Sequence, residues 1–321
     1  MSIEQGALHE ALGKVAGDRL QSVRLAEGVA TVMLDVGGLD RLARDKLKTA
    51  VRDAARLAGV ADLRLGMTAE RKARAIIAVG SGKGGVGKST LSANLAVAMA
   101  RLGRKVGLVD ADIYGPSQPR LLMTEGRRPE AEGNKMHPVP SPYGVPMLSM
   151  GHLVQPGQAI AWRGPMAGNA LGQLIDAHWG DAEILVVDLP PGTGDVQLTM
   201  LQKHKPAGAV IVSTPQDLAL MDATRAIGLL EQGQVPLIGM VENMAGYICP
   251  HCGEESDPFG VGGAEAAAKT MGLPFLGRVP LDLTIRRESD AGNPPAAGDG
   301  PQAEAFLAIA RGVLAWLDGK R

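Results

Sequence analysis

A glycine-rich segment that follows an apolar strand and opens a helix limits the fold of this chain more than any other feature. Residues 75–79 have the pattern of a strand, and residues 90–102 have the pattern of a helix. Between the two patterns stand Gly82, Lys83, Gly84, Gly85, Val86, Gly87, Lys88, Ser89 and Thr90. Glycines let backbone N–H groups converge on phosphate oxygens, and the N-terminus of a helix favours the same anion. The segment therefore predicts a phosphate-binding loop in an α/β fold.

The polar side chains of this loop suit a magnesium nucleotide. Lys88 is expected to neutralise the β- and γ-phosphates, and Ser89, in preference to Thr90, to offer a hydroxyl to Mg²⁺. A second lysine, Lys83, follows the first glycine of the loop. Because positioned positive charge does most of the work in phosphoryl transfer, Lys88 is a candidate catalytic group. The role of Lys83 comes from a resemblance described below.

Carboxylates follow two further apolar strands. Asp110 and Asp112 come after residues 106–109, and Asp188 ends the run 184–187. The carboxyl ends of parallel strands meet at one edge of a sheet, so these side chains should face the phosphates. We expect Asp188 to reach Mg²⁺ through water and residues 188–195 to form a switch loop that senses the γ-phosphate. Capping of strand ends is the structural alternative for Asp110 and Asp112.

The pattern of the rest of the chain predicts two domains joined by a linker at 68–74. Residues 1–67 read as a small α+β unit, with a helix through Leu8, Leu12 and Val15, a turn at Glu27 and Gly28, a helix between residues 40 and 59, and a strand at 60–65. Residues 75–321 predict a mostly parallel sheet with helices on both faces. Its strands are expected at 75–79, 106–109, 184–187, 209–212, 237–241 and 275–277.

Two segments of the larger domain are less regular or open to more than one interpretation. Residues 126–156 are rich in glycine and proline and predict an irregular excursion with short strands. Residues 302–317 predict an amphipathic helix. Packing on the chain's own sheet is favoured over a membrane-surface role, because the polar face lacks a stripe of Lys and Arg.

Composition excludes some classes of function. The 321 residues carry 33 basic and 34 acidic side chains, so no overall field attracts nucleic acid or anionic lipid. The N-terminus shows no basic stretch followed by an apolar run, and no run of about 18 apolar residues occurs. We therefore expect a cytoplasmic protein with no nucleic-acid and no membrane partner.

The chain has two cysteines, Cys249 and Cys252, too close together to close a stabilising disulfide loop. Their spacing places two thiols within reach of one metal centre. Iron–sulfur clusters and structural zinc both usually take four ligands, so a two-fold dimer with both cysteines from each chain would complete a site. His251 between them is expected to face solvent more than to act as a ligand.

Seven stretches resemble the Mrp/ApbC family of iron–sulfur cluster carrier ATPases. They cover residues 76 to about 297 in order, and they read GKGGVGKST, DADIYGPSQP, WRGPM, DLPPGTGD, STPQDLAL, VENMAGYICPHCGE and VPLDLTIRRESDAGNPP. The position of Lys83 resembles the deviant Walker A motif of the class that contains MinD, Mrp, ParA and the nitrogenase iron protein. Residues 1–67 are similar to the small MIP18-like domain that precedes many of these ATPases, although here that unit contains no cysteine.

The resemblance implies roles for individual residues. Lys83 would reach across a homodimer interface to the partner's nucleotide, so that slow ATP hydrolysis needs the dimer. Asp112 would orient or activate the attacking water, and Asp110 would lie nearer the metal. Asn243 matches the position that hydrogen-bonds the adenine edge, with a buried turn-forming asparagine as the alternative. The motif at residues 162–166 is expected near the dimer face.

The resemblance also implies a function. The chain would be an ATP-binding and hydrolysing carrier that holds an iron–sulfur cluster on Cys249 and Cys252 of two subunits. It would pass the cluster to apo iron–sulfur proteins, with cluster scaffold proteins as further partners. Both [4Fe–4S] and [2Fe–2S] fit the sequence, and we expect the first. Cluster release is expected to respond to the nucleotide through residues 188–195.

Three other interpretations share the fold. A positioning ATPase like MinD or ParA would share Lys83, but the cysteine pair and the neutral composition count against it. A structural zinc clasp on the four cysteines of a dimer remains open, since zinc and iron both accept thiolates. An electron-transfer ATPase like the nitrogenase iron protein also bridges a cluster between subunits, but fewer motifs of this chain resemble it.

Overall fold

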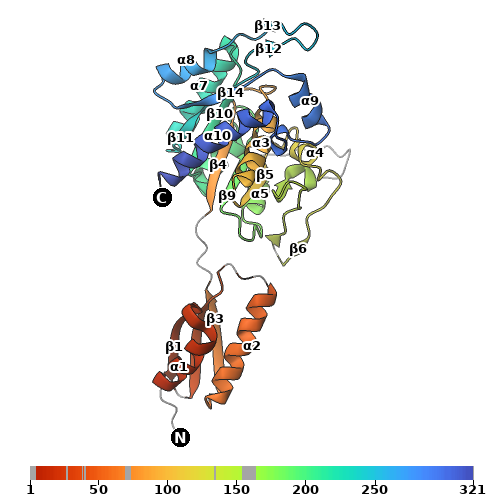
Figure 1. Cartoon of the computed structure of the whole chain (residues 1–321). Coiled ribbons are helices and arrows are strands. Elements are labelled where there is room, and N and C mark those ends of the chain that lie inside the picture. Colours follow the sequence, from red (N-terminus) through yellow and green to blue (C-terminus); the bar gives the residue numbers. More distant parts are fainter. Residues whose placement is uncertain are drawn as a thin grey trace. The chain divides into compact units, whose positions relative to one another are not determined.

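The computed structural model describes residues 5–26, 28–37, 39, 41–68, 74–133, 135–153 and 164–320. The chain divides into two compact units, Met1–Ala73 and Arg74–Arg321 (Figure 1). Of the linker expected at 68–74, residues 69–73 lie outside the described part. None of the described helices is long and apolar enough to cross a membrane.

The first unit is a three-stranded sheet covered by two helices. Strand β2 lies in the middle, antiparallel to β1 and parallel to β3. Gly28 has a φ of 80° between β1 and β2, where the turn is predicted, while Glu27 lies outside the described residues. The elements are α1 (Gln5–Ala16), a 3-10 turn (Gly17–Arg19), β1 (Leu20–Ala26), β2 (Val29–Asp35), α2 (Arg41–Leu57) and β3 (Asp62–Thr68).

The core of this unit differs in detail from the predicted helix faces. Leu8 and Leu12 are fully buried, as the helical spacing predicts, whereas Val15 is 41% exposed and Ala16 takes its place on the inner face. Leu42 is also exposed on α2. Both residues stand near helix ends, Val15 one residue before the end of α1 and Leu42 one residue after the start of α2.

A seven-stranded sheet forms the centre of the second unit. Its strand order is β14-β11-β10-β4-β9-β5-β8, and every neighbouring pair is parallel. The sequence predicts six of these strands; β8 lies in the irregular excursion and is too short to show a period. The strands are β4 (Ala75–Gly80), β5 (Val106–Asp110), β8 (Met147–Ser149), β9 (Ile184–Asp188), β10 (Gly208–Ser213), β11 (Leu237–Asn243) and β14 (Phe275–Val279).

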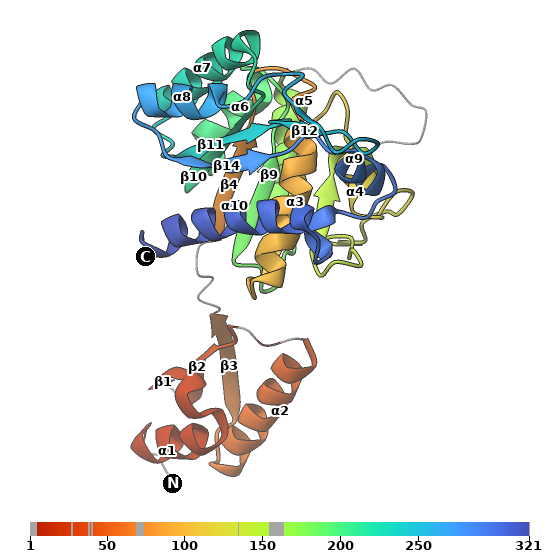
Figure 2. The same ribbon diagram turned by 45° about the horizontal axis from the view of Figure 1, so that its top comes forward.

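Alternate residues of the strands bury against helices on opposite faces of this sheet. Ile77 and Val79 pack with α3 and α10, whereas Ala78 packs with α5, α7 and α8 on the other face. Figure 2 shows α3 and α10 lying together in front of the strands. The covering helices are α3 (Lys88–Arg101), α5 (Gly164–Ile175), α7 (Asp217–Gln232), α8 (Gly263–Thr270) and α10 (Pro301–Asp318).

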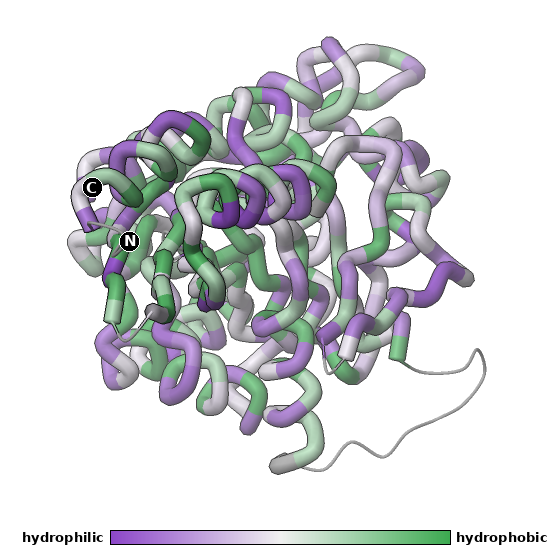
Figure 3. The backbone as a smooth tube through the Cα atoms, turned by 90° about the horizontal axis from the view of Figure 1, so that it is seen from below, coloured by the Kyte–Doolittle hydropathy of each residue, from purple (hydrophilic) through white to green (hydrophobic). Residues whose placement is uncertain are grey.

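The C-terminal helix α10 packs on the sheet, as the favoured interpretation predicts. Phe306, Ile309 and Val313 are at most 1% exposed. Burying a side chain of this size contributes about 1.5–3 kcal/mol, which holds the helix on its own fold. Figure 3 shows hydrophobic and hydrophilic residues mixed along the outer helical turns.

Short elements fill the connections. The excursion contains a small hairpin, β6 with β7, before the edge strand β8. Trp162 and Arg163 of the WRGPM motif lie outside the described residues, and Met166 is exposed at the start of α5. The remaining elements are α4 (Gln118–Leu121), β6 (Ala131–Glu132), β7 (Lys135–Met136), α6 (Asp195–Thr199), β12 (Tyr247–Ile248), β13 (Glu255–Ser256), α9 (Leu283–Asp290) and turns of 3-10 or π type at Met150–His152, Met200–His204 and Pro295–Ala297.

Candidate functional site

The predicted phosphate loop connects the carboxyl end of the central strand β4 to α3. Gly85 and Gly87 have φ values of 80° and 82°, in the region that glycine adopts without strain. A Cβ on Gly87 would lie 2.0 Å from Asn243 Nδ2, and one on Gly82 would lie 2.0 Å from the backbone carbonyl carbon of Asp222 in α7. These positions therefore need glycine because of both conformation and close packing.

The side chains predicted to bind a magnesium nucleotide gather at this edge. Lys88 is buried at the start of α3, and its Nζ lies 2.7 Å from Asp188 Oδ1 and 3.8 Å from Asp112 Oδ2. The same Nζ lies 3.4 Å from Ser89 Oγ. One cation, one hydroxyl and two carboxylates thus come together beside the loop, from three different segments of the chain.

Asp188 is fully buried and accepts hydrogen bonds from two residues that the sequence reasoning missed. Ser92 Oγ donates to Oδ1 at 2.8 Å, and Gln118 Nε2 donates to Oδ2 at 2.8 Å. Gln118 Nε2 also donates to the Ser89 carbonyl at 2.9 Å. The sequence does indicate Ser92 as a candidate site residue, because it is a polar residue one helical turn after Lys88 on an otherwise apolar helix. No pattern in the sequence indicates Gln118, since a glutamine in a polar loop usually faces solvent.

Asp110 shapes the segment between β5 and α4. Its carboxyl accepts hydrogen bonds from the backbone N–H groups of Asp112 and Gln118, both at 3.2 Å, and from Ser149 Oγ at 2.8 Å. Burial, together with the nearby Asp188 carboxylate, raises the pKa of Asp110 to about 8 against these hydrogen bonds. At neutral pH this carboxyl is therefore mostly protonated. The acidic side chains that contact Lys88 are Asp188, at 2.7 Å, and Asp112, at 3.8 Å.

The predicted switch loop lies directly beside the phosphate loop. The N–H of Gly192 donates to the Ser81 carbonyl at 3.0 Å, and Gly192 has a φ of 86°. Gln197, a buried residue of α6, donates through Nε2 to the Pro190 carbonyl at 2.6 Å and to the Gly192 carbonyl at 3.1 Å. A single side-chain amide therefore holds the backbone of the 188–195 loop in place.

Lys83 and Asn243 take different positions around the loop. Lys83 is half-buried, and its side chain has no ion-pair partner among the residues described. Asn243 ends β11 and is buried; its Nδ2 donates to the Val86 carbonyl at 2.8 Å. The structure thus places Asn243 against the phosphate loop, and its contact with adenine stays a prediction.

The cysteine pair sits in a small exposed ribbon made by β12 and β13. The Cys249 N–H donates to the Glu254 carbonyl at 2.9 Å, and the Gly253 N–H donates back to the Cys249 carbonyl at 2.8 Å. Backbone N–H groups of Cys252 and then His251, followed by the Cys252 side chain, lower the pKa of the Cys249 thiol. Both thiols are free, and Cys252 is exposed. The turn therefore carries two free thiols, one exposed and one half-buried with its ionisation favoured, which is the donor set of a thiolate metal or cluster site.

The ribbon also borders a cavity of about 560 Å³. The walls include Tyr247 and Ile248 of β12, the segment after β14 and the start of α10. Ile248 lines this cavity and is 64% exposed, so its apolar side chain faces solvent beside the cysteines. The surface next to the cysteines is therefore hollow and partly apolar.

The chain matches one family model over most of its length and is similar in sequence to curated proteins. Residues 72–314 match the family model described as ParA, NUBPL iron-transfer P-loop NTPase. The iron–sulfur cluster carrier protein of Escherichia coli (strain K12) is 48% identical over 238 residues, or 74% of this chain and 64% of that protein's length. The chain thus matches less than two thirds of that relative.

Two solved structures extend the comparison. The nucleotide-binding protein from Archaeoglobus fulgidus in complex with ADP has a TM-score of 0.62 and 40% identity, covering 72% of this chain and 91% of that one. The cell division ATPase MinD of Pyrococcus furiosus has a TM-score of 0.57 and 24% identity, covering 76% and 99%, and shows the shared fold alone. With its motifs, sheet order and family match in agreement, the chain belongs to the NUBPL iron-transfer P-loop NTPase family.

Proposed function

We propose that this protein is an ATP-hydrolysing carrier of iron–sulfur clusters, which it takes up as cargo on Cys249 and Cys252 and passes to apo-proteins. The observation that carries the proposal is the exposed cysteine ribbon, with both thiols free and the pKa of Cys249 lowered. The name of the Escherichia coli relative, an iron–sulfur cluster carrier protein, supports the same function. Localisation in the cytoplasm is part of this proposal.

The nucleotide in the proposal is ATP with Mg²⁺. The donors at the phosphate loop fit such a ligand, because the Ser89 hydroxyl and the Asp188 carboxylate are oxygen ligands of the kind Mg²⁺ takes, directly or through water. When bound, the ion would neutralise charge on the phosphates. Lys88 binds the phosphates, and Asp112 orients the attacking water. The archaeal relative solved with ADP supports nucleotide binding.

A homodimer completes both sites in the proposal. Lys83 has no acidic partner among the described residues of its own chain, which suits a role at the nucleotide of a second subunit. One chain supplies only two thiols, and a two-fold axis supplies the four that a cluster of the [4Fe–4S] type takes. Cluster release responds to the nucleotide through the 188–195 loop, whose backbone bonds the phosphate loop at Ser81.

The test is the content of iron, acid-labile sulfide and zinc per dimer in protein purified and reconstituted without oxygen. Near-equal iron and sulfide, absent from the Cys249→Ala variant, is the expected result. Stoichiometric zinc that needs Cys249, without sulfide, would overturn cluster binding and leave a P-loop NTPase with a structural zinc clasp. Transfer to an apo iron–sulfur protein, followed by the absorbance of the recipient, then tests delivery.

A further inference from the structure

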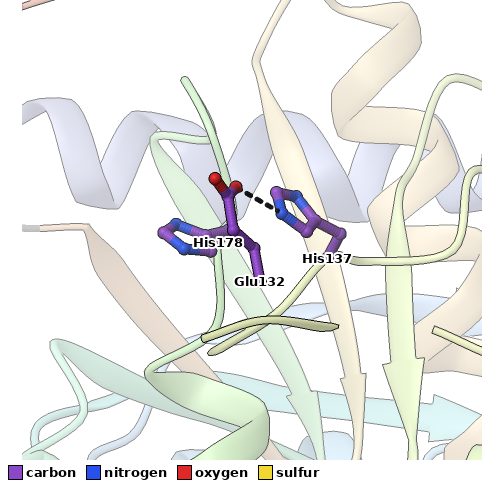
Figure 4. A group of neighbouring side chains, drawn as sticks. All are labelled: Glu132, His137 and His178. Carbon is purple, nitrogen blue, oxygen red and sulfur yellow. Dashed lines mark hydrogen bonds and ion pairs between the residues drawn. The ribbon is translucent and has the colours of Figure 1, made fainter. Parts of the chain in front are cut away.

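Three side chains on the larger unit that the nucleotide and cysteine sites do not use lie together. Figure 4 shows Glu132, His137 and His178 beside one another, with a dashed line between His137 and Glu132. A carboxylate oxygen and one nitrogen from each ring all lie within 4.8 Å of one another. His137 Nε2 is 3.1 Å from Glu132 Oε2, and the two imidazole rings stack with centroids 4.9 Å apart.

We propose that Glu132, His137 and His178 form a second metal site, for a divalent ion of the zinc type. Two imidazoles and one carboxylate are a ligand set that zinc accepts, and a water would take the fourth position. The set contains no thiolate, so it favours zinc-type divalent ions over the iron–sulfur cargo of the cysteine ribbon.

The backbone around this cluster is held firmly although the side chains reach the surface. The His137 N–H donates to the Glu130 carbonyl at 2.7 Å, and the His178 N–H donates to the Met136 carbonyl at 2.8 Å. Next in the chain, Trp179 is 3% exposed and its indole N–H donates to the carbonyls of Leu174 and Ile175. The two histidines therefore start from fixed positions.

We expect the three side chains to reach the geometry of a bound ion by rotating about their side-chain bonds. At zinc–nitrogen distances of about 2.0–2.1 Å, tetrahedral ligand atoms stand roughly 3.3 Å apart. The ligand atoms here already lie within 4.8 Å, and the closest pair is at 3.1 Å. Rotation of the rings and of the Glu132 side chain closes the remaining gap without moving the hairpin or the turn.

A surface salt bridge explains only part of this arrangement. Glu132 and His137 lie on one hairpin and would pair without a metal. His178 comes from the turn between α5 and β9, some forty residues later, yet its ring stacks on His137. An ion held by all three side chains would connect the β6–β7 hairpin to the turn that leads into β9.

This site is separate from the nucleotide edge. His178 precedes β9, whereas Asp188 ends it, and the strands β4, β9 and β5 are parallel. The cluster therefore lies at the amino ends of the strands, while the phosphate loop and the cysteine ribbon follow their carboxyl ends. Zinc found in the purified protein then has two sources, and only one of them depends on the cysteines.

The experiment is a zinc titration of the full chain carrying Cys249→Ser and Cys252→Ser, in competition with a chromophoric chelator. We expect about one equivalent of Zn²⁺ per chain. His178→Ala or His137→Ala should weaken binding at least tenfold, because loss of an outer partner of a metal ligand already costs about 10–100-fold. Glu132→Gln should weaken it less. His9→Ala, an exposed histidine of the other unit, is the matched control and should change nothing.

The melting temperature with and without zinc is a second measurement, which separates loss of metal binding from misfolding of a variant. Zinc should raise the melting temperature of the cysteine-free chain, since a ligand that binds only the folded state stabilises it. The same addition should leave the melting temperature of the His178→Ala chain unchanged. If the cysteine-free chain binds no stoichiometric zinc, or binds it equally well without His137 and His178, the proposal is wrong. Neither result bears on cluster carriage by the cysteines.

Discussion

The phosphate loop and the cysteine ribbon follow the carboxyl ends of nearby strands, yet one chain builds them very differently. At the loop, Asp188 is fully buried and accepts hydrogen bonds from Lys88, Ser92 and Gln118. At the ribbon, the turn between two strands of two residues each carries the thiols, and Cys252 is exposed. Within one chain the first site has a buried network of hydrogen bonds, whereas the second offers two thiols.

In the proposed function, the difference follows from what each site has to do. Stabilising charge on a phosphoryl group works best with fixed dipoles in a site that excludes water, and burial provides both. A cargo that must leave for another protein needs accessible ligands and a second protein surface close by. The ribbon meets those needs because the fold leaves it exposed next to a partly apolar cavity.

The largest expected effect tests whether the two sites are separable. Cys249→Ala should abolish cluster binding, because the remaining thiols of a dimer no longer make four ligands. Nucleotide affinity should stay within about twofold, since no described hydrogen bond joins the Cys249 side chain to the phosphate loop. The measurements are iron and sulfide content and the Kd for ATP.

The neighbouring histidine provides the matched control. His251→Ala changes an exposed residue between the cysteines and should leave the cluster in place. Loss of the cluster in this variant would make His251 a ligand. A tenfold change in ATP affinity in Cys249→Ala would show that the two sites are not independent, because the ribbon would then be part of the nucleotide site.

The second effect lies at the nucleotide. Lys88→Ala should lower the rate of ATP hydrolysis by about 10²–10³-fold or more, the usual cost of losing one group that stabilises transition-state charge. The variant should still bind the cluster but fail to deliver it. The measurements are phosphate release and transfer to an apo-protein, with Lys105→Ala as control, since that exposed lysine pairs with Asp181 at the other end of the strands.

Lys88 also has a structural role that complicates its removal. It is the cation nearest the buried Asp188, and breaking a buried ion pair costs about 3–5 kcal/mol. Lys88→Arg keeps the positive charge and should retain more stability while still losing hydrolysis, because a planar guanidinium does not replace a compact ammonium. Normal delivery by either variant would show that cluster release does not depend on hydrolysis.

The smallest effect concerns protonation at the nucleotide edge. Because the pKa of Asp110 is raised from 3.8 to about 8, the folded chain keeps a proton that the unfolded chain releases. The stability that this proton gives is fully present below about pH 4 and is lost as the pH rises toward about 8. Asp110→Asn has no such loss, so its melting temperature relative to the natural chain should rise between about pH 5 and pH 8.

The loss between pH 5 and pH 8 is about 3–4 kcal/mol, because one pKa unit corresponds to about 1.4 kcal/mol. The expected gain is therefore about 6–16 °C, since 1 kcal/mol corresponds to about 2–4 °C in a domain of this size. Asp181→Asn is the control. The hydrogen bond from Lys105 lowers the pKa of Asp181, so its effect on stability should show no trend in the same pH range. A flat difference for Asp110→Asn would mean that Asp110 is already ionised at about pH 5, and the buried edge would then carry more negative charge than described.

The sequence predicts the sheet because most of its strands are nearly continuous apolar runs, the pattern of a parallel sheet covered on both faces. The strands β4, β5 and β9 end in Gly or Asp. The phosphate loop is predictable for a similar reason, since its glycines are required by backbone conformation. Gln118 and Gln197 were not predictable as site residues. Their roles depend on hydrogen bonds to carbonyls and carboxylates that tertiary folding brings near, and no local pattern records such a bond.

The amide of Asn243 donates to the Val86 carbonyl, so this side chain braces the phosphate loop in addition to any role at the base. Its deletion leaves a buried carbonyl without a donor, at a cost of about 1–3 kcal/mol, and loosens the grip on every nucleotide alike. Discrimination between purines, by contrast, is a ratio of two affinities, and a shared loss cancels in a ratio. The preference of an Asn243→Ala chain for ATP over GTP therefore reports on the base, while its absolute affinity reports on the brace.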